Sequence, residues 1–335
     1  GWVTDHPEDA DARLLLGQVL AEGGRQEDAF GVWQGLLEEL PADAERFRAV
    51  STRLRDLGQL QRALDVLVWG ARELDGDPFP WERAEVALRM GRFDDAVEAH
   101  LDLLRQEPNR LPLVESRIAS IAAAELEAGL LDGGRAQRYC DAVAEALSRS
   151  EPAERIALTL ILAGSRLEVG EPRRGLQALQ TAIESDEVLQ AVFTFASRCE
   201  ERGHADEAAA AYALYAAHGG DSPYRYRSML KQAEMVESLG DIQAAIDLYA
   251  GLAAANPRRS ESVEALLRVA RLQGLVLGDA DLALQTLSTL EGRTRSGGMR
   301  RRLLSLRTEC YVRLDDLAAA RRQLEALSAD VDGAI

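Results

Sequence analysis

Histidine and cysteine, the side chains that most often bind metals or attack substrates, are few in this chain and widely spaced. The 335 residues contain four histidines and three cysteines: His6, His100, His204, His218, Cys140, Cys199 and Cys310. No two histidines have the spacing of zinc ligands, and the cysteines are odd in number and more than 50 residues apart, which argues against zinc and against a disulfide framework. We expect the cysteines to be buried, small apolar residues on helices.

Carboxylates and glycine pairs are also candidates for chemistry, but their positions do not suggest a reaction. The acidic side chains recur where helices are expected to begin and on polar faces, which accounts for them without acid–base catalysis. The glycine pairs at 23–24, 133–134, 219–220 and 297–298 lack the strand–turn–helix context of a phosphate-binding loop. We therefore predict a protein that is not an enzyme and that has no cofactor and no metal site.

The helices expected to carry these residues are marked by a recurring sequence motif of fixed spacing, which we call the phrase. It consists of a glycine, or once an aspartate, then four residues and a small residue. The phrase occurs eight times, at Gly24–Ala29, Gly58–Ala63, Gly91–Ala96, Gly170–Gly175, Gly203–Ala208, Gly240–Ala245, Gly278–Ala283 and Asp315–Ala320. Its internal gap is constant, while the repeat length drifts from 33 to about 40 residues. A short fixed phrase on a long, variable period is typical of stacked helix hairpins.

Each part of the phrase has a physical role in such a hairpin. Glycine ends the first helix because it adopts the left-handed conformation without steric cost. We expect the acidic residues that follow to cap the second helix by accepting backbone N–H groups, and to oppose the positive end of its dipole. These residues are Glu27, Asp28, Asp94, Asp95, Asp206, Glu207, Asp279 and Asp281.

A second small residue lies twelve positions before the end of the phrase in seven of the eight cases. These seven are Gly17, Ser51, Ala84, Ala163, Ala196, Ala233 and Thr308. Small residues on facing sides allow two helices to approach closely, so each phrase predicts a tight antiparallel pair. The eighth position is Arg271, unless the connection there is one residue longer and Ala270 occupies the position instead.

This pattern resembles the tetratricopeptide repeat (TPR) family from about Asp9 to Ala329, and it is similar to bacterial TPR solenoid proteins. The segment LLLGQVLAEGGRQEDAFGVWQGLLEELP has Gly17, Gly24 and Pro41 at the spacings of the family, with Trp33 where Tyr or Phe is usual. The resemblance implies an all-α, right-handed superhelical solenoid of about nine antiparallel helix hairpins. A strong helix-forming composition with only 5% aromatic residues agrees with this fold.

The regularity of the repeats predicts four segments along the chain. Residues 1–110 form three regular hairpins, and residues 111–152 form an irregular fourth, with helices at 111–129 and 134–149, that lacks the phrase. Two regular hairpins follow at 153–223 and three longer ones at 224–335. The longer repeats resemble those of bacterial envelope-assembly proteins.

Net charge and hydropathy limit the class of partner. The formal net charge is −17, which disfavours nucleic acid and favours a basic or neutral protein. No stretch approaches 18 consecutive apolar residues, so we expect no insertion into a membrane. The abrupt start at Gly1 suggests a trimmed fragment, and the compartment stays open between the cytoplasmic and periplasmic sides of a bacterial envelope.

Charge is also distributed unevenly between the two ends of the chain. Residues 1–110 hold 23 acidic and 13 basic side chains, whereas residues 293–322 hold 9 arginines and 3 acids. The centre of this basic segment is formed by Arg293, Arg295, Arg300, Arg301 and Arg302. They belong either to a solvated loop and helix start or to a docking site for an acidic partner, including the acidic end of a second copy.

The resemblance also implies where a protein or peptide partner would bind, because the first helices of TPR hairpins line a concave groove. The groove positions carried over to this chain are Leu14, Gln18, Arg48, Thr52, Arg55, Trp81, Glu85, Leu88, Phe193, Ser197, Arg227 and Glu234. With Leu14 and Gln18 in the first repeat, the carboxylate clamp of the family is missing. Trp81 is the strongest contact candidate, with a core position as its alternative, and Phe193 has the same two interpretations.

His100 occupies the position in the second helix that Trp33, Tyr212 and Tyr249 hold in other repeats. We interpret it as a packed histidine with one hydrogen bond, with pH sensing or ligand binding as the alternative. The function predicted from the sequence is a non-catalytic scaffold that binds a partner peptide or helix in the groove. The alternative is that the chain is the helical interaction or regulatory part of a larger enzyme or envelope-assembly complex. This alternative includes self-assembly of copies of the chain head to tail.

Overall fold

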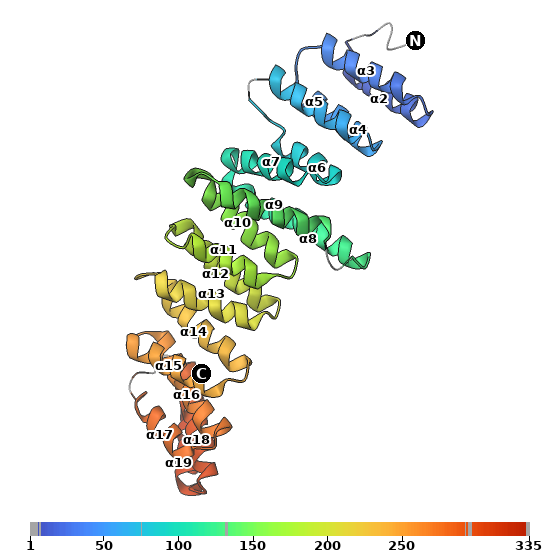
Figure 1. Cartoon of the computed structure of the whole chain (residues 1–335). Coiled ribbons are helices and arrows are strands. Elements are labelled where there is room, and N and C mark those ends of the chain that lie inside the picture. The colour runs from blue at the N-terminus through green and yellow to red at the C-terminus, as the bar shows by residue number, and fades with distance from the viewer. Residues whose placement is uncertain are drawn as a thin grey trace. The chain divides into compact units, whose positions relative to one another are not determined.

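The protein is all-helical wherever its structure is described. The computed structural model describes residues 6, 8–74, 76–130, 133–291, 293 and 297–332. These residues form eighteen consecutive α-helices and contain no strand (Figure 1). The predicted fold class, a TPR-like repeat of helix hairpins, is confirmed.

The chain divides between Glu171 and Pro172 into two compact units. The division into four segments remains a prediction. The first unit contains α2 (Ala10–Glu22), α3 (Gln26–Glu39), α4 (Ala44–Asp56), α5 (Leu60–Glu73), α6 (Pro80–Met90), α7 (Phe93–Gln106), the short η1 (Pro108–Arg110), α8 (Leu111–Glu127), α9 (Arg135–Arg149) and α10 (Pro152–Glu168).

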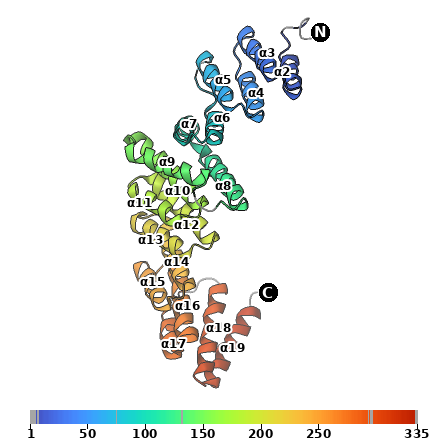
Figure 2. The same cartoon turned by 45° about the vertical axis from the view of Figure 1, so that its right-hand side comes forward.

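The second unit begins with α11 and continues with four hairpins. It contains α11 (Pro172–Thr181), α12 (Asp186–Glu201), α13 (Ala205–His218), α14 (Pro223–Ser238), α15 (Ile242–Ala255), α16 (Ser260–Arg271), η2 (Leu272–Val276), α17 (Ala280–Ser288), α18 (Gly297–Arg313) and α19 (Leu317–Asp332). Within each unit the two helices of a hairpin lie side by side in both views (Figure 2).

The turn inside each hairpin has the conformation that the repeated phrase predicts. All seven phrase glycines have φ between 74° and 87°, and Asp315 takes the same left-handed region with φ of 58°. In the first hairpin the N–H of Arg25 donates to the carbonyl of Leu20 at 2.8 Å, and Gln59 and Leu54 repeat this bond at 2.9 Å. These bonds satisfy carbonyls at the end of the first helix.

The expectation that the acidic residues after the glycine cap the second helix is mostly wrong. In α3, α7 and α13 the N-cap residues are Arg25, Arg92 and His204, and none caps through its side chain. The acidic residues of these helices lie in the first turn, where their charge opposes the positive end of the helix dipole. Asp279 is the exception, because its carboxylate accepts from the N–H of Leu282 at 2.9 Å.

Small residues do bring the paired helices together, but their contacts differ from hairpin to hairpin. The hydroxyl of Ser51 donates to the carbonyl of Ala63 at 3.1 Å, so this twelve-residue pair is in direct contact. Gly17 instead faces Trp33: a Cβ at Gly17 would lie 2.1 Å from the indole Nε1. The indole then donates to the carbonyl of Leu14 at 3.2 Å.

The exceptional eighth repeat contains one extra residue, as the alternative at Ala270 requires. Ala270 is buried with 1% exposure, and the helix continues into the π-helical η2 before the turn at Gly278. A π-helical turn accommodates an inserted residue without ending the helix. Gly274 in η2 permits the tight packing there, since its Cβ would be 2.9 Å from both Ala283 Cβ and Cys310 Sγ.

The irregular fourth hairpin keeps the glycine turn but replaces the rest of the phrase. Gly129 has φ of 77°, and the buried small residue is Ala136, two positions later than in the phrase. The carboxylate of Glu125, near the end of α8, accepts from the N–H of Arg135 at 2.7 Å and of Ala136 at 3.2 Å. Glu125 therefore caps α9 from the neighbouring helix.

Candidate partner-binding faces

Three of the predicted groove residues in the first unit lie in its interior. Leu14 is 8% exposed, Leu88 1% and Glu85 8%. Burial leaves these side chains little accessible surface, and their assignment as contact residues stays a prediction. Leu14 lies on α2, and Glu85 and Leu88 lie on the short α6.

Two charged candidates of the first unit connect neighbouring first helices. Arg48 on α4 donates to Glu82 on α6 at 2.6 Å and to the carbonyl of Pro78 at 2.7 Å. Glu85 on α6 accepts from Arg117 on α8 at 2.5 Å. Half-buried pairs of this kind hold the register of adjacent repeats, and a partner that used these charges would have to break them.

Trp81 on α6 covers a buried histidine. Its ring centroid lies 6.1 Å from that of His100 on α7, whose Nδ1 is 2.7 Å from the hydroxyl of Tyr139 on α9. His100 is completely buried, its Nε2 has no partner among the described residues, and burial, aided by the charge of Arg117, lowers its pKa to about 3. Trp81 itself is only half-buried, so part of its ring remains accessible.

The remaining candidates in this unit lie at or near the surface. Gln18 is exposed and donates to Glu22 at 3.0 Å, and Arg55 lies 3.5 Å from the carboxylate of Asp56. Thr52 is half-buried. These positions stay predictions as contact residues.

The second unit brings two of its candidates into one aromatic cluster. Phe193 on α12 lies with its ring centroid 5.3 Å from that of Tyr224 on α14, and 5.8 Å and 5.5 Å from those of Tyr212 and Tyr215 on α13. The guanidinium of Arg227, one turn after Tyr224, lies 6.0 Å from the Phe193 centroid. Tyr212 and Tyr215 are buried, whereas Tyr224 is 47% exposed and Arg227 is also exposed.

Next to this cluster, the first helices of the second unit are joined by hydrogen bonds and ion pairs. Ser197 lies 3.2 Å from the hydroxyl of Tyr212, which donates to Glu200 at 2.8 Å. Lys231 on α14 then bridges Glu200 on α12 at 2.7 Å and Glu234 at 3.2 Å. We call the continuing series the charge ladder; its further members are Arg268 and Glu264 on α16 and Arg302 on α18.

The charge ladder shifts the pKa values of Lys231 and Glu264 toward their charged forms. Burial acts to lower the pKa of Lys231, but the hydrogen bond to Glu200 and the nearby carboxylates raise it overall. Burial acts to raise the pKa of Glu264, but Arg302 and Arg268 hold it below its usual value. The candidate Glu234 is therefore part of an internal network, and its charge is balanced by Lys231 and Arg268.

The arginines of the last repeat are mostly engaged inside the chain. Arg302 donates to both oxygens of Glu264, and Arg293 donates to the carbonyl of Pro257. Arg301 is exposed and bonds only weakly to the carbonyl of Gly297, at 3.4 Å, and Arg300 is also exposed. Arg295 lies outside the described residues. Docking of an acidic partner here, and self-association through it, remain predictions.

The described part of the chain offers neither a metal-binding cluster nor a membrane-spanning helix. It contains no group of three or more His, Cys, Asp or Glu side chains arranged to hold a metal ion. Within the same residues, no helix has both the length and the apolar character that crossing a bilayer requires.

Comparison with known proteins adds structural neighbours but no relative by sequence. No protein-family model and no curated protein matches the chain. Among solved structures, it is similar to a Podosopora anserina kinesin light chain with nearly identical TPR-like repeats, at 16% identity over 54% of this chain and 97% of that chain, with a TM-score of 0.30. It is also similar to the TPR domain of P58(IPK), at 16% identity over 97% and 99% of the two chains, with a TM-score of 0.26.

A third neighbour is the TPR2AB domain of yeast Sti1 in complex with pHSP90, at 15% identity over 91% of this chain and 99% of that chain, with a TM-score of 0.32. These neighbours are TPR-repeat proteins. The class of the protein is defined by its own hairpins. It is an all-α protein of TPR-like repeats.

Proposed function

We propose that this protein is a non-catalytic scaffold that binds a segment of another protein on the first-helix face of its second unit. The observation that carries the proposal is the group formed by Phe193, Tyr224 and Arg227, which we call the aromatic face. Tyr224 and Arg227 are exposed and flank Phe193, and the three side chains lie on the neighbouring first helices α12 and α14. Aromatic and arginine side chains are the residues that most often dominate binding energy in protein interfaces.

The chemistry around the aromatic face favours ring contacts over charge as the source of affinity. Buried Tyr212 and Tyr215 pack beneath Phe193, which fixes its ring and lowers the entropy lost on binding. The acidic groups beside it, Glu200 and Glu234, are already paired with Lys231. We therefore expect the bound segment to present an apolar or aromatic side chain to Phe193 and Tyr224.

The test is a selection of short random peptides displayed on phage against the intact chain, followed by affinity measurements with the synthesised peptides. We expect Tyr224→Ala to weaken the selected peptides by about tenfold or more, as for an interface hot spot. The control is Tyr226→Ala on the same helix, which removes a tyrosine that packs against the interior and under Arg259. Circular dichroism verifies that both variants are folded.

Two results would contradict the proposal. One is a selection in which every peptide binds wild type and Tyr224→Ala equally. The other is an equal loss for Tyr224→Ala and Tyr226→Ala with folding intact, because a general disturbance of α14 would then explain the effect.

A further inference from the structure

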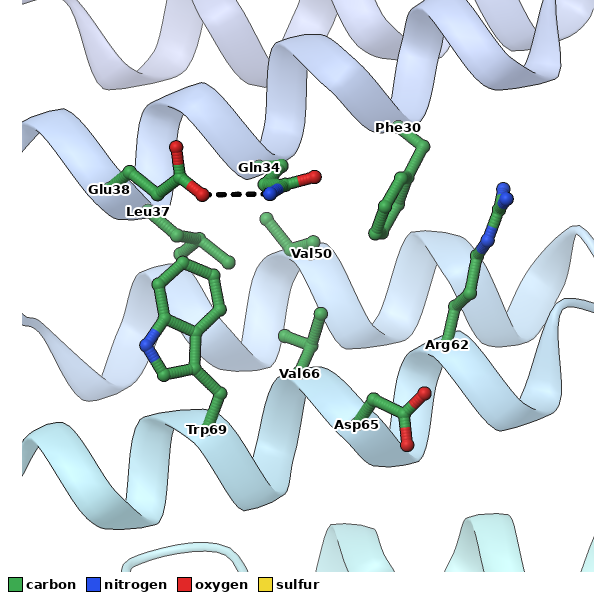
Figure 3. A pocket seen from close by; sticks show the side chains of 9 residues that line it. All are labelled: Phe30, Gln34, Leu37, Glu38, Val50, Arg62, Asp65, Val66 and Trp69. Atoms are coloured by element: carbon green, nitrogen blue, oxygen red, sulfur yellow. Dashed lines mark hydrogen bonds between the residues drawn. The ribbon is translucent and has the colours of Figure 1, made fainter.

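A hollow lies on the second-helix face of the first unit, between α3 and α5 (Figure 3). Its volume is about 330 Å³. The floor is aliphatic and consists of Leu37, Val50 and Val66, while Phe30 and Trp69 stand on either side. This size is at the lower end of the range for binding pockets, and an apolar floor between aromatic walls suits a large apolar side chain.

The rim of the hollow is polar and carries negative charge without a matching cation. Glu38 and Asp65 are exposed, and each accepts a hydrogen bond from a glutamine, Gln34 and Gln61 respectively. Neither carboxylate has an ion pair within the described structure. The one basic residue on the rim, Arg62, is neutralised by Glu27, to which it donates at 2.8 Å and 3.0 Å.

Two glycines within α3 leave the backbone beside the hollow uncovered. Gly31 and Gly35 precede the rim residues Gln34 and Glu38 by three positions, so they lie next to them on the helix surface. A Cβ at Gly31 would meet no atom within 4 Å, and one at Gly35 would make only an ordinary contact at 3.5 Å. Nothing inside the chain therefore requires glycine at either position, although glycine destabilises a helix relative to alanine.

We propose that this hollow is a second docking site, for a protein segment that inserts a leucine- or phenylalanine-sized side chain flanked by lysine or arginine. The apolar side chain fills the space between Phe30 and Trp69, and the flanking cations pair with Glu38 and Asp65. The segment lies across α3, where Gly31 and Gly35 allow close backbone approach. The complementary charge follows from the rim, and the site is independent of the aromatic face.

A substitution at Gly31 separates binding from stability. Gly31→Gln removes a flexible residue from an exposed helix and should raise the melting temperature, while its side chain obstructs the approach over α3. Gly251→Gln is the matched control, because Gly251 also lies exposed within a helix, α15, with no atom within 4 Å of an added Cβ. The charge variant is Glu38→Lys combined with Asp65→Lys, both at exposed positions.

The probes are short random peptides displayed on phage, selected on the intact Tyr224→Ala protein so that the aromatic face does not dominate. We expect the enriched peptides to combine a large apolar residue with adjacent Lys or Arg. Their affinity should fall about tenfold or more in Gly31→Gln and in the charge variant and should weaken as salt is added. Gly251→Gln should bind them like the parent protein.

The inference is overturned if the enriched peptides carry no basic residues, if none is enriched, or if Gly31→Gln and the charge variant bind them unchanged. It is also overturned if Gly251→Gln loses affinity equally. A negative result for the hollow does not contradict the proposal for the aromatic face, because that site is tested in the wild-type background with different variants.

Discussion

The hydroxyl of Tyr139 lies 2.7 Å from Nδ1 of His100, and both side chains are completely buried. This contact joins α7 to α9 across the junction between the third and fourth hairpins. The rings also meet edge to face, with centroids 5.5 Å apart. At the same repeat position Trp33 donates within its own hairpin, to the carbonyl of Leu14, whereas His100 makes its polar contact with the next hairpin.

The burial of His100 makes stability depend on pH. Its pKa is about 3 in the fold and near 6.5 when the chain is unfolded, so below pH 6.5 the unfolded state binds a proton that the folded state does not. Stability should fall by about 1.4 kcal/mol per pH unit from pH 6.5 down toward pH 3. Urea unfolding of the wild type and of His100→Gln across this range measures the effect as a difference. Parallel curves for the two proteins would contradict it.

The left-handed aspartate in the last turn should be suboptimal. Asp315 has φ of 58°, where the equivalent positions have glycine, and a Cβ in this region is sterically unfavourable. We expect Asp315→Gly to stabilise the protein by about 0.5–1 kcal/mol. The reverse change, Gly278→Asp, should destabilise it by a similar amount in the same thermal unfolding experiment. A loss of stability in Asp315→Gly would show that the aspartate side chain has a role of its own.

The contact between Gly17 and Trp33 should tolerate no added carbon. Because a Cβ would lie 2.1 Å from the indole Nε1, Gly17→Ala must displace the ring and weaken its bond to the carbonyl of Leu14. We expect a loss of about 1–3 kcal/mol by urea unfolding. Gly251→Ala, in an open helical position, is the control and should gain stability instead. Equal effects at the two glycines would rule out the steric explanation.

Within the charge ladder, Glu264 should contribute to stability only while its carboxylate is ionised. Its pKa is below the ordinary value of 4.5, so its contribution is complete above pH 4.5 and declines as the pH falls through the lower pKa of the folded state. We expect Glu264→Gln to cost about 0.5–1 kcal/mol at pH 7 and progressively less below pH 4.5. Glu261→Gln on the same helix, 4.0 Å from Arg259, should cost less. A cost for Glu264→Gln that does not change with pH would indicate packing rather than charge.

The hairpins and their turns could be predicted from the sequence because the signal for them is local. A glycine followed by a small residue at fixed spacing determines where one helix ends and where the next packs, and each such glycine takes the left-handed conformation. The extra residue near Arg271 was also visible, since the twelve-residue spacing fails there. The fourth hairpin could be recognised as irregular because it lacks the phrase. Its capping by Glu125 could not be predicted from the sequence.

The candidate contact residues could not be assigned in the same way, because exposure depends on how each helix rotates against its neighbours. Leu14, Glu85 and Leu88 occupy groove positions by spacing, yet packing buries them. Packing also determines which charged side chains are available to a partner. Arg302, for example, is paired with Glu264, 38 residues away. The hollow between α3 and α5 arises from side chains of three helices.

The sequence by itself therefore determined the repeat, its helices and the left-handed turns, which depend on backbone conformation within a few residues. Only the tertiary structure decided which polar groups are paired and which apolar groups remain exposed. Those properties arise between helices about one repeat apart, where small changes in rotation and spacing exchange one neighbour for another.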